Sequence, residues 1–142
     1  MIIREYQIDD EPAVITLWHE TNLIVPQNDP GKDIARKLKV NRELFLVGEI
    51  DNQIVATIMG GYEGRRGWIN LLCVSPSQRG NGYARELVQH LENLLINKGC
   101  PKINLQIRHS NENAIKFYKS IGYSDDHVFS MAKKLELPND SS

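Results

Sequence analysis

The chain has 142 residues, which suits one domain with its own core and is too short for two ordinary domains. Its hydrophobic fraction of 41% and charged fraction of 25% are typical of soluble globular proteins and argue against extensive disorder. The 17 Lys and Arg side chains nearly balance the 18 Asp and Glu side chains, so the basic surplus expected of a nucleic-acid-binding protein is missing.

The cysteines and the apolar runs give no sign of an oxidising compartment or of a membrane. Cys73 and Cys100 form no CxxC pair and have no histidine at metal-ligand spacing, which predicts two reduced thiols and no metal site. No run reaches the ~18 apolar residues of a membrane span, and the first residues do not resemble a signal peptide. We therefore expect a cytoplasmic protein without a metal ion.

Strands and helices alternate in the first half of the chain, as hydrophobic periodicity and capping residues indicate. The expected elements are a strand over Ile2–Ile8, a helix capped by Asp9 or Asp10 and running through Trp18, a loop over Asn22–Pro30, a short helix starting at Asp29-Pro30, and strands over Leu44–Ile50, Gln53–Tyr62 and Trp68–Val74. The pair Asp51-Asn52 predicts a tight turn between the second and third of these strands.

The second half continues the alternation. A polar loop over Ser75–Asn81 leads into an amphipathic helix that Gly99 ends, and Ile103–Ile107 alternates as a fifth strand. Asn113–Ser120 is then expected to be helical, and Val128–Leu135 to form a last strand. Interleaved strands and helices predict a layered α/β fold with a mixed sheet.

The loop after the fourth expected strand is a candidate anion site. The helix that follows it offers unpaired backbone N–H groups and the positive end of its dipole. Gly80 and Gly82 let an anion approach the backbone, and Arg79 adds a positive charge. For a bare Gly-x-Gly, an ordinary strand–helix turn is the simpler interpretation. The Rossmann and P-loop motifs are both missing, because Arg85 stands where a third glycine is needed and no Gly-Lys-Ser/Thr is present.

The wider pattern resembles the GCN5-related N-acetyltransferases (GNAT). Arg79-x-x-Gly82-x-Ala84 is similar to their R/Q-x-x-G-x-G/A signature, and Leu72-x-Val74-x-Pro76 is typical of the strand before it. A second block, Asn111-x-x-Ala114-x-x-x-Tyr118 followed by Ile121-Gly122-Tyr123, comes in the right order and separation. Together the blocks cover about the second half of the chain. The run Pro26-x-Asn28-Asp29-Pro30 further resembles a bacterial branch, the YpeA-like acetyltransferases.

The resemblance implies one α/β domain over residues 1–137 and a disordered tail over residues 138–142. The implied sheet is mixed and mostly antiparallel, has six or seven strands, splays between the fourth and fifth strands, and is flanked by four helices. Acetyl-CoA is the implied co-substrate, with its pyrophosphate on the backbone N–H groups of the loop. The residues implied to bind it are Leu72, Val74, Arg79, Gly80, Asn81, Gly82, Tyr83, Ala84, Asn111 and Tyr118.

Two of these residues are implied to act in the reaction. The N–H of Leu72 would stabilise the thioester oxygen as it becomes negative. Tyr118 would protonate the leaving thiolate, and a phenol with a pKa near ~10 is protonated at neutral pH. Without the surrounding motif, plain packing would be the better interpretation of Tyr118. Asn111 would contact the pantetheine arm and can cap its helix at the same time.

The resemblance leaves the base and the acceptor site open. Some relatives that acetylate protein N-termini carry a carboxylate on the fifth strand, where this chain has Gln106, and an amide cannot act as a base. Glu49 or Glu63 could act through water, although each is more often a plain surface carboxylate. Candidates on the acceptor side are Trp18, Asn28 and Asp29, of which Trp18 also suits the core and Asp29 a helix cap.

The leading hypothesis is an N-acetyltransferase in which a primary amine attacks acetyl-CoA directly. A non-catalytic acyl-CoA-binding sensor or regulatory module is the alternative, and a structural domain without a cofactor is a third. Protein N-termini, lysines, amino acids, polyamines and antibiotics are all possible acceptors. The expected partner is thus a small-molecule or peptide amine, with neither nucleic acid nor membrane, and the chain is expected to be a monomer or a homodimer.

Overall fold

The strands of the sheet lie side by side in the order in which they occur along the chain, β1-β2-β3-β4-β5. The computed structural model describes residues 1–24 and 28–138, which divide into two units, Met1–Leu105 and the residues from Gln106 onward. All of the strands belong to the first unit: β1 (Ile2–Glu5), β2 (Phe45–Ile50), β3 (Gln53–Tyr62), β4 (Gly67–Val74) and β5 (Ile103–Leu105).

The four expected helices are all found in the described residues. The first unit contains α1 (Glu11–Glu20), α2 (Pro30–Lys37) and α3 (Tyr83–Asn97), and the second contains α4 (Glu112–Ser120). Short 3-10 turns precede α1, β2 and α3, at Ile8–Asp10, Arg42–Leu44 and Pro76–Gln78.

The sheet is mixed and mostly antiparallel, as expected. The first three pairings are antiparallel, and β4 pairs with β5 in parallel. The β2–β3 hairpin turns at Asp51 and Asn52, whose φ angles of 51° and 64° are the left-handed values that such a turn needs. The parallel pairing joins only Gly67–Ile69 to Ile103–Leu105, so β4 runs on to Val74 beyond its contact with β5.

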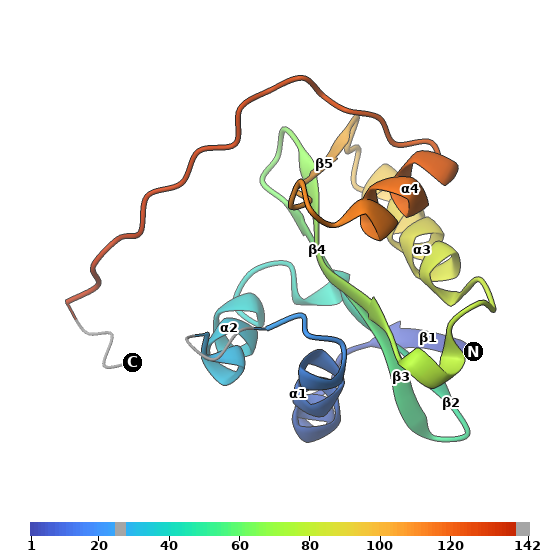
Figure 1. The fold of residues 1–142 in the computed structure, drawn as a ribbon. Coiled ribbons are helices and arrows are strands. Elements are labelled where there is room, and N and C mark those ends of the chain that lie inside the picture. Colours follow the sequence, from blue (N-terminus) through green and yellow to red (C-terminus); the bar gives the residue numbers. More distant parts are fainter. Residues whose placement is uncertain (25–27, 139–142) are drawn as a thin grey trace. The chain divides into compact units, whose positions relative to one another are not determined.

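Helices cover both faces of the sheet in the first unit (Figure 1). On one face, Trp18 of α1 donates a hydrogen bond from its indole to Thr57 of β3. On the other face, the side chain of Leu91 in α3 lies so close to Gly60 of β3 that a Cβ at this glycine would be only 2.5 Å from it. Thr57 and Gly60 differ by an odd number of positions, so the Thr57 side chain and a Cβ built at Gly60 lie on opposite faces, as the strand period requires.

Packing on the α1 face is aromatic at its centre. The rings of Tyr6 and Phe45 stack with centroids 4.4 Å apart, and Trp18 lies against Phe45 at 6.2 Å. Further buried side chains of this cluster come from α1, α2 and the sheet: Val14, Leu17, Ile34, Val47, Met59 and Cys73. The cluster fixes α1 and α2 to one side of β3 and β4.

The prediction of a last strand over Val128–Leu135 is wrong, because the structure describes no strand there. Within the described residues the sheet has five strands instead of the expected six or seven. The segment is extended and exposed, with Phe129 96% and Met131 90% accessible. Alternating apolar residues indicate a strand, but a strand exists only where a neighbour completes its ladder of hydrogen bonds. Within residues 124–138 no such ladder is described.

Two strand ends differ from the expected ones by more than one residue. The first strand ends at Glu5 instead of Ile8, because the N–H of Gln7 donates to Asp10 and the chain turns there. The fifth strand ends at Leu105 instead of Ile107. Residues 139–142 of the expected tail lie outside the described residues, and the single domain over residues 1–137 stays a prediction.

Candidate active site

The loop between β4 and α3 has the backbone geometry that an anion site requires. Gly80 and Gly82 have φ angles of 84° and 78°, in the left-handed region that other residues enter at a cost. Neither glycine has an atom within 4 Å of the position where a Cβ would stand, so open space faces both. Gly82 is the N-cap of α3 and offers no side chain to its first turn.

Backbone N–H groups at the start of α3 are left without a protein acceptor. The first hydrogen bond of the helix runs from the N–H of Glu86 to the carbonyl of Gly82, at 3.1 Å. In the described chain, none of the N–H groups from Gly80 to Arg85 has an acceptor. Exposed side chains of Arg79 and Asn81 border these amides. The loop therefore presents donors and a helix dipole to solvent, and an anionic group fits there.

Strand β4 contains a bulge just before this loop. Thr57 pairs with Cys73 and Met59 pairs with Asn70, so Ile58 alone faces both Leu71 and Leu72. Leu71 has a φ of 50°, a left-handed conformation that costs roughly 1–2 kcal/mol for a residue with a Cβ. A bulge of this kind locally interrupts the regular ladder of hydrogen bonds at Leu71 and Leu72.

The two other β4 and loop residues expected at the cofactor occupy the end of the strand. Val74 is buried and pairs with Ala56 of β3. Its carbonyl accepts a hydrogen bond at 3.3 Å from Nε of Arg79, so the arginine folds back over the strand end. Tyr83 and Ala84 are half-buried in the first turn of α3.

The remaining expected residues lie in the second unit. Asn111 is the N-cap of α4, and its Oδ1 accepts a hydrogen bond from the N–H of Ala114 at 3.1 Å. Tyr118 is 8% exposed, and its ring contacts those of Phe117 and Tyr123 with centroids 5.1 and 5.4 Å apart. Burial raises the pKa of the Tyr118 phenol, so the group is protonated at neutral pH.

The candidate bases are held by other groups. Glu49 forms an ion pair with Arg4 at 3.4 Å, and Glu63 accepts hydrogen bonds from the N–H groups of Arg65 and Arg66 in its own turn. Gln106 donates from Nε2 to the hydroxyl of Ser130 at 2.6 Å. Both candidate carboxylates are therefore already bonded within the protein, and Gln106 is an amide, so none of these three residues is assigned as the base that deprotonates an amine.

Of the acceptor-side candidates, two have structural roles. Trp18 is fully buried in the core, and Asp29 caps α2 by accepting from the N–H of Lys32 at 3.1 Å. Asn28 is exposed. Pro26, the first residue of the loop that resembles the YpeA-like branch, lies outside the described residues.

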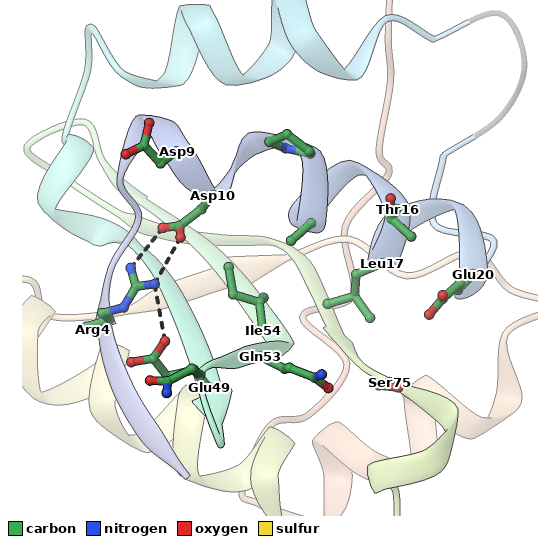
Figure 2. A pocket seen from close by; sticks show the side chains of 13 residues that line it. Arg4, Asp9, Asp10, Thr16, Leu17, Glu20, Glu49, Gln53, Ile54 and Ser75 are labelled. Atoms are coloured by element: carbon green, nitrogen blue, oxygen red, sulfur yellow. Dashed lines mark hydrogen bonds and ion pairs between the residues drawn. The ribbon is translucent and has the colours of Figure 1, made fainter.

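Apart from the loop before α3, a recess lies beside α1 and the β2–β3 hairpin (Figure 2). It has a volume of about 540 Å³ and is lined by α1 residues such as Thr16 and Leu17, by Ile54 of β3, and by Ser75 after β4. Its charged lining consists of one arginine and four carboxylates, Arg4, Asp9, Asp10, Glu20 and Glu49. The recess is acidic as a whole.

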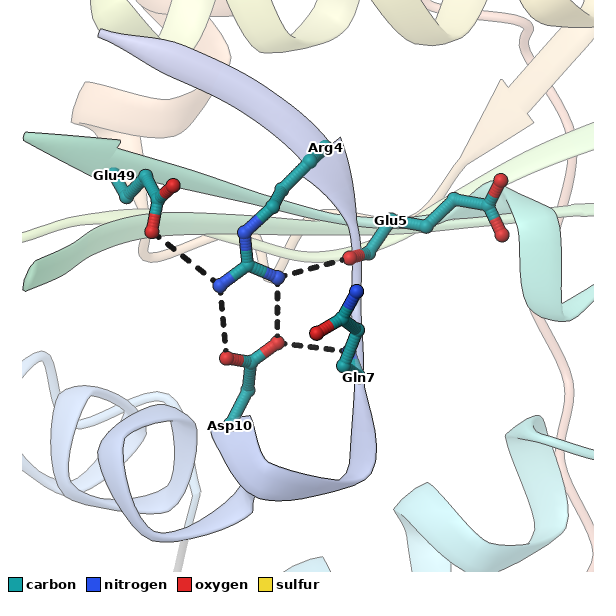
Figure 3. A network of polar contacts seen from close by, with 5 residues as sticks. All are labelled: Arg4, Glu5, Gln7, Asp10 and Glu49. Atoms are coloured by element: carbon teal, nitrogen blue, oxygen red, sulfur yellow. Dashed lines mark hydrogen bonds and ion pairs between the residues drawn. The ribbon is translucent and has the colours of Figure 1, made fainter. Parts of the chain in front are cut away.

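Arg4 in this recess is already engaged by the protein (Figure 3). Its guanidinium forms a two-pronged contact with Asp10, at 2.8 and 2.9 Å, and donates to the Glu5 carbonyl at 3.0 Å. The hydrogen bond from Arg4 is the main reason why the pKa of Asp10 is lowered. Asp10 is the N-cap residue of α1, as expected, but its carboxylate makes no hydrogen bond to the helix. It accepts from the N–H of Gln7 instead and so joins β1 to the start of α1.

Thr57 is a buried polar residue that the sequence did not single out. It is fully buried in β3, and its hydroxyl contacts the Trp18 indole, the Leu71 carbonyl and the Cys73 thiol. The only signal in the sequence is one hydroxyl within the apolar run Ile54-Val55-Ala56-Thr57-Ile58-Met59. A threonine is common in strands, so that signal does not separate it from a packing residue.

Comparison with a family model and with curated proteins gives a consistent result. The model described as the acetyltransferase (GNAT) family matches residues 6–123, which spans parts of both units. A protein named acetyltransferase from Yersinia pestis (strain Pestoides F) is 44% identical over 135 residues, covering 95% of this chain and 96% of its own length.

Solved structures share the fold at low sequence identity. The structure of AAC(6')-Iy in complex with the bisubstrate analogue CoA-S-monomethyl-acetylneamine has a TM-score of 0.78 at 16% identity, covering 94% of this chain and 97% of that one. A predicted acetyltransferase from Clostridium acetobutylicum, solved with acetyl-CoA, has a TM-score of 0.69 at 23% identity, covering 92% and 95%. Among the described residues, no helix has the length and apolarity to cross a bilayer, and no cluster of three potential metal ligands occurs.

Proposed function

The chain belongs to the acetyltransferase (GNAT) family and is an acyltransferase, and from this premise we propose that it moves an acetyl group from acetyl-CoA to a primary amine by direct attack. The observation that carries the proposal is the row of N–H groups without acceptors between Gly80 and Arg85. These donors and the dipole of α3 suit the pyrophosphate of a coenzyme A thioester. In a purely structural domain the same amides would be hydrogen-bonded to water.

Binding of the pantetheine arm is assigned to one residue of β4 and to the N-cap of α4. We propose that the Val74 backbone pairs with the pantetheine arm and that Asn111 donates to it from Nδ2, because Oδ1 is used by the helix cap. The exposed loop residues Arg79, Gly80, Asn81 and Gly82, followed by Tyr83 and Ala84, would enclose the pyrophosphate.

In the proposed reaction the amine attacks the thioester carbon, the carbonyl oxygen becomes negative, and the carbon–sulfur bond then breaks. The N–H of Leu72 stabilises the oxygen, which makes it a donor aimed at charge that exists only in the transition state. Tyr118 gives its proton to the departing thiolate. Its buried phenol stays protonated, which suits an acid in the resting enzyme.

The test is a turnover assay with purified protein, acetyl-CoA and a panel of amines that includes peptides with free N-termini, lysine peptides, amino acids, polyamines and aminoglycosides. Release of free thiol is followed by a thiol reagent, and the acetylated product by mass spectrometry. Saturable turnover with one amine class supports the proposal. Tight acetyl-CoA binding with no turnover across the panel contradicts it.

The alternative, an acyl-CoA-binding sensor, is favoured by one specific observation. Gln106 stands where some relatives that acetylate protein N-termini carry a carboxylate, and it is bound to the hydroxyl of Ser130. A sensor would bind acetyl-CoA and free coenzyme A with unequal affinities and show no product in the assay above. Calorimetry with both ligands, run beside the turnover assay, therefore separates the two functions. The oligomeric state and the cytoplasmic location stay predictions.

A further inference from the structure

Leu71 differs in kind from the other non-glycine residues in the left-handed conformation. Within residues 1–24 and 28–138, those residues are Asn22, Asn41, Asp51, Asn52 and His127. Asparagine, aspartate and histidine enter this region comparatively often, whereas a leucine within a strand is a genuine outlier. Such a conformation persists only where the surrounding structure holds it in place. A contact from elsewhere in the protein must therefore hold the backbone at Leu71.

The hydroxyl of Thr57 is the group in contact with it. Thr57 Oγ1 lies 3.1 Å from the Leu71 carbonyl oxygen and 3.0 Å from Nε1 of Trp18, with the Cys73 sulfur at 3.3 Å. An indole N–H can only donate, a carbonyl can only accept, and a thiol can do either. The single hydroxyl hydrogen of Thr57 is therefore donated to the Leu71 carbonyl, with the Cys73 thiol as a donor to Oγ1. Trp18 thus fixes the direction of the hydroxyl, and the hydroxyl fixes the carbonyl.

The planarity of the peptide bond carries this constraint to the next residue. The carbonyl of Leu71 and the N–H of Leu72 belong to one rigid trans unit and point in opposite directions. A hydrogen bond that holds the carbonyl towards Thr57 therefore holds the Leu72 N–H away from Thr57. The burial of Thr57, which is 0% exposed, keeps water from competing for the bond.

We infer that Thr57 is a positioning residue: its hydroxyl, oriented by the Trp18 indole, holds the Leu71 carbonyl and so aims the Leu72 N–H at the thioester oxygen. The inference rests on the proposed function, because it assigns a purpose to the donor that the reaction needs. Thr57 contacts neither substrate and acts only through the Leu71–Leu72 peptide.

Thr57→Val and Thr57→Ser form the test pair. Valine has nearly the shape of threonine but leaves the Trp18 N–H and the Leu71 carbonyl unpaired, whereas serine keeps the hydroxyl. We expect Thr57→Val to lower kcat roughly tenfold or more, short of the ~10²–10³-fold loss that follows removal of an oxyanion donor. The Kd for coenzyme A should stay within about twofold, and Thr57→Ser should recover most of kcat.

A structural readout that does not depend on turnover accompanies the kinetics. The backbone amide of Leu72 is followed by ¹⁵N–¹H NMR in the protein alone and with coenzyme A. Thr57→Val should shift this resonance and raise its exchange with solvent, and Thr57→Ser should leave it near the wild-type position. Ile34→Val, a shortened buried side chain of the same core cluster on α2, serves as the matched control and should change neither kcat nor the Leu72 resonance.

The outcomes separate this inference from the proposed function. If the wild-type protein acetylates no amine, the proposed function fails, and the Leu72 resonance still decides whether Thr57 holds the bulge. If turnover occurs but Thr57→Val keeps the wild-type kcat, the inference is wrong and the proposed function stands. An equal loss of kcat in Thr57→Val, Thr57→Ser and Ile34→Val would likewise overturn it, because core damage would then be the cause.

Discussion

Two polar regions of the first unit differ in whether their hydrogen-bonding groups have partners within the protein. Around Arg4, Asp10 and Glu49, each charged group has found a partner within the protein, and the contacts join β1 to α1 and to the end of β2. At the start of α3, between Gly80 and Arg85, backbone donors have no acceptor in the described chain. The first arrangement stabilises the fold, and the second leaves donors available for a ligand.

The difference between the two regions leads us to expect a ligand at the start of α3 and not around Arg4. The first N–H groups of any helix have no partner within the helix and are met by water or by a ligand, so exposed donors beside two glycines are a place where an anionic ligand can bind. Charge alone would have pointed to the recess beside α1, which has four carboxylates around one arginine. That arginine is paired with Asp10 and Glu49, and these contacts hold β1 against the start of α1 and the end of β2. The following changes test the contrast between satisfied and unsatisfied groups.

The largest effect is expected at Tyr118, whose buried phenol is the proposed acid. Tyr118→Phe should lower kcat by about 10²–10⁴-fold, the usual contribution of a general acid, while the Kd for coenzyme A stays unchanged. Steady-state kinetics and calorimetry measure the two quantities. Tyr62→Phe, which removes a hydroxyl from the end of β3, is the control and should retain activity. Full activity in Tyr118→Phe would remove the acid from the mechanism.

The next effect is expected in the loop before α3. Gly82→Ala places a Cβ at a φ of 78° and disturbs donors that would each contribute ~1.5–3 kcal/mol with a charged acceptor, so the Kd for coenzyme A should rise by about 10²-fold. Gly64→Ala is the matched control, because Gly64 also has a left-handed φ, of 101°, with open space around it. Both variants should lose a similar ~1 kcal/mol of stability. Equal cofactor affinity in the two would refute the anion site.

A third change breaks the satisfied region. Asp10→Asn removes the charged partner of Arg4 and should lower the free energy of unfolding by about 2 kcal/mol at pH 7. Because the pKa of Asp10 is lowered in the folded state, this stabilisation is complete above the unfolded pKa near ~3.9 and is lost as the pH falls through the folded pKa. Urea unfolding at pH 7 and near pH 2 measures it.

The comparison for Asp10 is an exposed pair. Glu43 lies 2.8 Å from Lys98 with its side chain 40% exposed, and Glu43→Gln should cost only about 0.5 kcal/mol. A loss of the same size in both variants would mean that the partly buried Arg4–Asp10 contact has no special weight.

The smallest effect is expected at Arg79, an exposed side chain beside the loop. Arg79→Ala should weaken coenzyme A binding only about threefold at low salt, because a solvent-exposed charge contributes little. The difference from wild type should disappear as ionic strength rises, since salt screens exposed charges. Calorimetry at two salt concentrations measures it, and a salt-independent loss would instead assign Arg79 a direct, shielded contact with the cofactor.

The sequence by itself determined the parts of the site that depend on neighbouring residues. The open backbone at Gly80 and Gly82, a helix dipole, and the cap that Asn111 provides for α4 all follow from residues a few positions apart. The helices, the β2–β3 turn and the mixed sheet were likewise predictable, because periodicity and turn residues act locally.

Only the tertiary structure decided the contacts between distant segments. The Trp18–Thr57 bond joins residues 39 positions apart, and the Arg4–Glu49 pair joins residues 45 apart. No local pattern indicates which hydroxyl will meet which carbonyl, because that depends on the register of β3 against β4 and on the rotation of α1. The prediction of a strand at Val128–Leu135 was wrong for the same reason. Its apolar residues alternate, but a strand also needs a neighbouring strand to pair with, and the sequence does not show which segment that would be.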